Sequence, residues 1–99
     1  MNENNGNGKR KFDVLRALIL NNLSHGQKTI NQIASETGIN WKTAENHLVY
    51  LVGKGYAFEI FSSKYVRIFE ITERGRNHLQ DITEKSKFQK SGEVTIGIK

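Results

Sequence analysis

Four hydrogen-bonding side chains recur along one stretch of the chain, between Trp41 and Lys54. They are Lys42, Thr43, Asn46 and Tyr50. An α-helix turns about 100° per residue, so it would place all four within roughly 100° of its circumference. Lysine can donate to guanine O6 and N7, and asparagine can pair with adenine N6 and N7. The spacing therefore predicts a helix face that is polar, hydrogen-bonding and only lightly charged.

The opposite face of this stretch is apolar and is expected to pack into a core. Its members are Trp41, Ala44, Leu48, Leu51 and Val52. Trp41 is expected to pack against the preceding helix rather than to stack on a base, and His47 is expected at the core margin. Gly55 should end the helix, because glycine readily adopts the left-handed conformation that follows many helices.

Two helices are predicted ahead of this stretch. Apolar residues at spacings of three and four predict the first, from about Arg10 to Leu23. The segment Thr29-Ile30-Asn31-Gln32 fits a capping box and predicts a short second helix to about Thr37. Gly38 permits a tight turn, and Asn40 is a favourable N-cap for the next helix.

The remainder of the chain predicts a hairpin and a fourth helix. Two runs rich in aromatic and β-branched residues, 56–61 and 65–71, are typical of paired strands. Thr72 should cap a helix to about Lys85. The alternation of Val94, Ile96 and Ile98 favours a terminal strand, which could equally be frayed.

A chain of 99 residues has room for one domain and one core. We expect a disordered, basic-ended tail over residues 1–9, a domain over 10–85 and a C-terminal tail over 86–99. Lys9-Arg10-Lys11 is either a basic arm that contacts DNA or a solubilising flank of the first helix. The predicted fold class is α+β, mainly α.

Four segments, in this order and spacing, resemble the winged helix-turn-helix family, especially its small archaeal and bacterial regulators. They are Ile33–Asn40, Thr43–Leu48, Leu51–Tyr56 and Ile71–Gly75, and the resemblance covers roughly Lys11 to Lys85. It implies a three-helix core, a β-hairpin wing and a C-terminal helix. Two positions depart from the family pattern: Ala44, where a larger aliphatic residue is frequent, and Gly53, where a charged one is common.

The resemblance implies a sequence-specific regulator of transcription that binds double-stranded DNA through the helix over residues 41–54. That helix would lie in the major groove, and the wing would contact an adjacent groove or the backbone. The expected base contacts are Lys42, Thr43, Asn46 and Tyr50. The expected backbone contacts are Lys28, Thr29, Lys64 and Arg67. We also expect a homodimer through the first and fourth helices, because the apolar stripes of the first helix and the terminal strand exceed what so small a domain covers alone.

The composition supports this interpretation and argues against others. Fifteen Lys and Arg against ten Asp and Glu give a net charge of +5 and a pI near 9.6, in the range that suggests a nucleic-acid partner. There is no cysteine, and the three histidines are scattered. We therefore expect no catalytic site, metal or cofactor. Without a long apolar run or a secretory leader, we expect a cytoplasmic, nucleoid-associated protein and no membrane partner.

Two alternatives stay open. A winged helix that binds protein would use Trp41, Val49 and Tyr50 as anchors. A non-specific architectural DNA-binding protein would need no base contacts. The cations at 28, 42, 64 and 67 favour DNA over protein, and the polar residues of the 41–54 stretch favour sequence preference.

Overall fold

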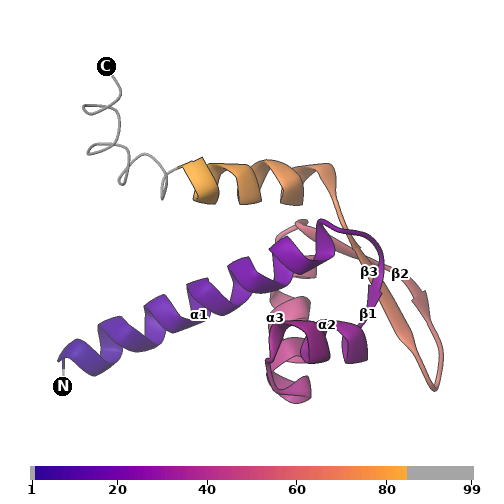
Figure 1. Ribbon diagram of the computed structural model, residues 1–99, viewed down its shortest axis with the longest axis horizontal. Helices are drawn as coiled ribbons and strands as arrows, with labels where there is room; N and C mark the ends of the chain where they lie inside the picture. Colours follow the sequence, from indigo (N-terminus) through magenta and orange to yellow (C-terminus); the bar gives the residue numbers. More distant parts are fainter. Residues whose placement is uncertain (1, 85–99) are drawn as a thin grey trace.

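The computed structural model describes residues 2–84, and it describes their side chains from Lys11 onward. The elements are α1 (Asn2–Leu23), β1 (Lys28–Thr29), α2 (Ile30–Thr37), α3 (Trp41–Gly53), β2 (Ala57–Ser62), β3 (Arg67–Ile71) and a last helix over residues 73–84. In Figure 1, α1 runs between the 73–84 helix and the pair formed by α2 and α3. The predicted α+β, mainly helical, winged-helix class is confirmed.

The core forms where α1, α2 and α3 pack against one another and against one face of the sheet. Its buried apolar residues are Ile19, Leu20, Leu23, Ile30, Ile33, Ile39, Ala44, Leu48, Leu51, Ala57, Phe69 and Ile71. Leu79 of the 73–84 helix packs against this cluster. All three helices contribute buried residues at helical spacing, so burial of these stripes fixes their mutual arrangement.

Local hydrogen bonds and one glycine fix the start of α2 and the turn between α2 and α3. The Thr29 hydroxyl oxygen accepts from Gln32 N, and Thr29 N donates to Gln32 Oε1, so the predicted capping box is confirmed. Gly38 adopts a φ of 76°, the left-handed conformation that glycine allows. Asn40 Oδ1 accepts from the backbone nitrogens of Lys42 and Thr43, as an N-cap should.

Within residues 2–84 the sheet has three antiparallel strands in the order β1-β3-β2. The predicted hairpin is present as β2 and β3, with a bulge between Glu59 and Phe61. The pairing of β1 with β3 was not predicted; it aligns Lys28 with Phe69 and Thr29 with Ile68. A two-residue strand is too short to show an alternating pattern, so only the fold reveals it.

The start of the 73–84 helix is held against the loop that precedes β2. Thr72 Oγ1 donates to Gly55 O at 2.6 Å and accepts from Gly75 N at 2.9 Å. Gly75 is buried, and a Cβ atom there would lie 2.0 Å from the carbonyl oxygen of Tyr56. The Thr72 to Gly75 segment therefore requires a cap at its first residue and no side chain at its last.

The terminal regions differ from expectation or lie outside the described residues. α1 begins at Asn2, earlier than the start expected near Arg10, so residues 2–9 lie within its first turns. Extending a formed helix adds one hydrogen bond per residue fixed, without a new nucleation step. The domain limits themselves stay a prediction, and the strand expected at 93–99 lies outside the described residues. Among residues 2–84, none of the helices is both long and apolar enough to span a membrane.

Candidate nucleic-acid interface

The exposed side of α3 carries most of the polar residues that the sequence singled out. Lys42 and Asn46 are exposed and Thr43 is half-buried, whereas Ala44 and Leu48 are buried behind them. The polar face predicted for this helix therefore exists on its N-terminal half. These polar side chains could exchange hydrogen bonds with a partner, and the apolar core beneath them would stay packed.

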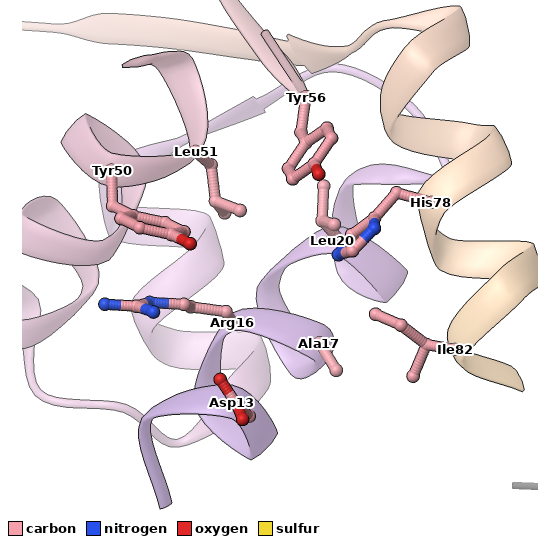
Figure 2. Close-up of a pocket in the computed structure, with 9 residues that line it drawn as sticks. All are labelled: Asp13, Arg16, Ala17, Leu20, Tyr50, Leu51, Tyr56, His78 and Ile82. Atoms are coloured by element: carbon pink, nitrogen blue, oxygen red, sulfur yellow. The ribbon is translucent and has the colours of Figure 1, made fainter. Parts of the chain in front are cut away.

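Tyr50 belongs to a different contact. The guanidinium carbon of Arg16 lies 3.6 Å from the centre of the Tyr50 ring. Figure 2 shows the two groups face to face between α1 and α3. Tyr50 therefore packs toward α1, although 38% of its surface is exposed, and its expected base contact stays a prediction. A helical wheel gives angles about one helix axis only, so it could not reveal this partner.

His47 is buried on the same side of α3, with 5% of its surface exposed. Its Nδ1 atom accepts a hydrogen bond from Arg16 Nε at 3.2 Å, and the Phe12 ring meets its imidazole edge to face. Burial lowers the pKa of His47 below the usual value for histidine, and the nearby charge of Arg16 lowers it further. The neutral imidazole thus joins α1 to α3, deeper in the core than the margin expected from sequence.

The wing is tied to α3 through Arg67. This guanidinium contacts Glu59 Oε2 at 2.7 Å and Glu45 Oε2 at 3.0 Å. The hydrogen bond from Arg67 lowers the pKa of Glu59, and the bond to Glu59 raises the pKa of Arg67. Arg67 was expected on the DNA backbone; in this structure its donors bridge β2, β3 and α3.

The other three residues expected to contact the DNA backbone differ in whether their side chains already have partners within the protein. Lys28 pairs with Glu36 at 2.9 Å, and only 17% of its side chain is exposed. Hydrogen bonds from Asn22 and Lys28 lower the pKa of Glu36. The Thr29 oxygen serves the α2 cap, whereas Lys64 is exposed at the tip of the wing. Of the four, Lys64 is the one whose placement suits a backbone contact directly.

Trp41 does not pack in the core, contrary to expectation. It is 44% exposed and borders a hollow of about 180 Å³ between α2, α3 and the wing. The hollow is lined by Ile30, Asn31, Trp41, Glu45, Lys64, Tyr65, Val66 and Arg67. The wheel placed Trp41 on the inward side, but at the first residue of α3 that side meets the open space beside the wing.

A second, larger hollow of about 360 Å³ lies on the other side of α3 (Figure 2). It is lined by Asp13, Arg16, Ala17, Leu20, Tyr50, Leu51, Tyr56, His78 and Ile82. The rings of Tyr56 and His78 stack in parallel with centres 4.1 Å apart. Its walls come from α1, α3 and the 73–84 helix, so it is separate from the hollow at Trp41.

A family model described as winged helix-turn-helix matches residues 9–90. The chain therefore belongs to the winged helix-turn-helix family. None of the curated proteins matches the sequence.

Solved structures of transcriptional regulators share the fold. BldR from Sulfolobus solfataricus has 23% identity and a TM-score of 0.71, over 83% of this chain and 60% of BldR. A MarR family regulator from Silicibacter pomeroyi has 22% identity and a TM-score of 0.67, over 94% and 64%. ZitR from Lactococcus lactis, as an apo mutant, has 14% identity and a TM-score of 0.68, over 96% and 74%. This chain thus spans about three fifths of the length of BldR.

Proposed function

We propose that this protein is a transcriptional regulator that binds double-stranded DNA sequence-specifically, with α3 in the major groove. The observation that carries the proposal is the exposed polar face formed by Lys42, Thr43 and Asn46 beside a cationic wing tip at Lys64. A helix about 10–12 Å across fits a groove about 12 Å wide. The regulators of similar fold support the same class of function.

The proposed contacts divide into two kinds. Lys42, Thr43 and Asn46 would contact base edges and so carry sequence information. Lys64 would contact phosphate and so contribute affinity to every sequence. The ion pairs of Arg67 support the proposal in another way, because they hold the wing at a fixed distance from α3.

We also propose that the regulator acts as a homodimer, in the cytoplasm at the nucleoid. Val14 and Leu18 are exposed one turn apart on the same face of α1. Burial of such a stripe against a second copy would bring two α3 helices to successive major grooves. A palindromic site with half-sites about ten base pairs apart, centre to centre, would follow.

Selection from random duplex DNA, followed by retardation of the selected and unrelated duplexes, tests the DNA proposal. If each protomer neutralises about four to six phosphates, log affinity should fall with log salt at about −0.9 per phosphate. The selected site should bind better than unrelated sequence at every salt concentration. Absence of retardation at about 50 mM salt would overturn the proposal and favour a protein-binding module.

Light scattering at micromolar concentration tests the dimer. The wild-type protein should have the mass of two chains, and Val14→Glu with Leu18→Glu should have the mass of one. Truncation after Ser91 tests whether the predicted terminal strand contributes to association. A wild-type monomer that binds one asymmetric half-site would overturn the dimer and leave the role of α3 intact.

A further inference from the structure

The hollow between α2, α3 and the wing brings together two aromatic side chains that the core does not use. Trp41 comes from the first residue of α3, and Tyr65, 86% exposed, comes from the tip of the wing. They are 24 positions apart in the sequence, yet both border one small hollow. An apolar pair of this kind, beside a cation, is a surface that a partner can cover.

The position of Tyr65 is fixed by the turn that carries it. Ser63 Oγ accepts from the backbone nitrogens of Tyr65 and Val66, each at 3.1 Å. Ser63 N donates to Val66 O at 2.8 Å, which closes the turn around Lys64 and Tyr65. Because Arg67 also anchors the wing to α3, the hollow requires little ordering when a partner binds.

The charges around the hollow suit an anionic partner. Lys64 contributes an ammonium group, whose nitrogen lies 5.8 Å from the centre of the Tyr65 ring. Glu45 also borders the hollow, but its two oxygens contact Lys42 Nζ at 3.1 Å and Arg67 Nη1 at 3.0 Å. The first turn of α2 borders the hollow as well, and the positive end of a helix dipole favours a negative group.

The size and position of the hollow limit which kind of partner it can bind. About 180 Å³ lies below the roughly 300–1,000 Å³ of pockets that enclose a small-molecule ligand. The hollow is instead open, and it lies between the polar face of α3 and the wing. In the proposed DNA-binding arrangement, with α3 in the groove and the wing on the backbone, a DNA strand in contact with both elements would pass over this hollow.

We propose that this hollow binds one nucleotide unit of the DNA backbone. Lys64 contacts its phosphate, and the rings of Trp41 and Tyr65 pack against its deoxyribose. This assignment rests on the proposed DNA-binding function and adds a specific backbone contact to it. Since sugars and phosphates carry no base identity, the contact strengthens binding to all duplexes alike.

Trp41 offers a direct readout, because it is the one tryptophan in the sequence. Its fluorescence is followed in the full-length protein while acrylamide is added, with and without saturating duplex DNA. Bound DNA should cover the exposed part of the indole and lower the quenching constant about two-fold. Binding itself is measured separately from the anisotropy of labelled duplex.

Three substitutions accompany the fluorescence measurement. Tyr65→Ala and Trp41→Ala should each weaken binding to every duplex about ten-fold, because each removes an aromatic surface that packs against the deoxyribose. Phe58→Ala is the matched control, because Phe58 is an exposed aromatic residue of the same hairpin that does not line the hollow. It should leave affinity unchanged. Tyr65 is so exposed that its removal cannot unfold the domain, so its result stands even where Trp41→Ala is unstable.

The outcomes separate this inference from the function on which it rests. Normal duplex binding, with unchanged Trp41 quenching and a wild-type affinity for Tyr65→Ala, would overturn the proposal that the hollow binds the DNA backbone. It would leave the proposed DNA-binding function intact. If Tyr65→Ala and Trp41→Ala weakened binding to single strands only, the proposal would be overturned as well, because the two rings would then form a site for base stacking. No binding to any duplex would overturn both.

Discussion

Arg16 of α1 stacks on Tyr50 of α3, with its guanidinium carbon 3.6 Å from the ring centre, while its Nε atom donates to His47 Nδ1. One side chain of α1 thus contacts two residues of α3 that lie three positions apart. These contacts help to set the orientation of α3, the helix proposed to enter the major groove, from the side that faces α1.

Replacing Arg16 with alanine should lower the free energy of unfolding by about 1–3 kcal/mol, because a partly buried cation–π contact and a hydrogen bond are lost together. Urea titration followed by circular dichroism measures the change. Lys11→Ala, at an exposed position of the same helix, is the control and should stay within about 0.5 kcal/mol of wild type. Equal stabilities for the two variants would contradict the coupling role of Arg16.

The stability of the protein should fall as pH drops from about 7 to 5. Because burial lowers the pKa of His47 in the folded state, the unfolded chain binds a proton there more readily. The contribution of neutral His47 is therefore complete above the unfolded pKa of about 6.5 and is lost progressively below it. Thermal melts across this range measure the slope.

His47→Gln should flatten that slope, since glutamine does not titrate. Glu36 and Glu59, whose pKa values are lowered, lose their contributions only as pH falls below their ordinary value of 4.5, so the two effects occupy different ranges. An unchanged slope between pH 7 and 5 in His47→Gln would show that His47 does not cause it.

Two glycines should respond in opposite directions to alanine. Gly75→Ala places a Cβ atom 2.0 Å from Tyr56 O, a backbone atom that cannot move freely, and should cost at least about 3 kcal/mol. Gly53→Ala meets no atom within 4 Å in the last turn of α3 and should stabilise the protein by about 1 kcal/mol. Parallel denaturant titrations compare them. Similar effects from both would mean that the approach of Gly75 to Tyr56 relaxes at little cost.

The Arg67 ion pairs should contribute mainly to the placement of the wing. Arg67→Ala and Glu59→Gln should show a coupling energy of about 1 kcal/mol in a double-mutant cycle, because the pair is hydrogen-bonded but about one third exposed. Arg67→Lys keeps the charge, yet it should recover only part of the stability because lysine lacks the forked donor geometry. Additive effects of the two single changes would refute the pairing.

Asn46 and Lys64 should affect DNA binding in different ways. Asn46→Ala should cost about 1–3 kcal/mol on the selected site and flatten preference at one base pair. Lys64→Ala should weaken selected and unrelated duplexes equally and reduce the salt slope by about one unit. Competition binding over a set of single-base variants measures both. Unchanged affinity and preference in Asn46→Ala would move the base-contacting face elsewhere on α3.

The amino-acid sequence by itself determined the order of the helices and of the hairpin strands and most of their ends, but not the two-residue strand β1. The capping box at Thr29, the left-handed Gly38 and the cap at Asn40 were predicted correctly. These features depend on hydrogen bonds between residues two to four positions apart, so a short segment contains all the atoms involved.

Only the tertiary structure decided the partners of the long polar and aromatic side chains. Arg67 pairs with Glu45, 22 positions away, and Arg16 contacts His47, 31 positions away. The β1–β3 pairing and the exposure of Trp41 have the same origin. In each case the contact joins two elements that are distant in sequence. A residue pattern within one element does not predict where the other element will pack. The sequence therefore predicted candidate DNA-contacting residues, and packing decided which of their polar groups pair within the protein.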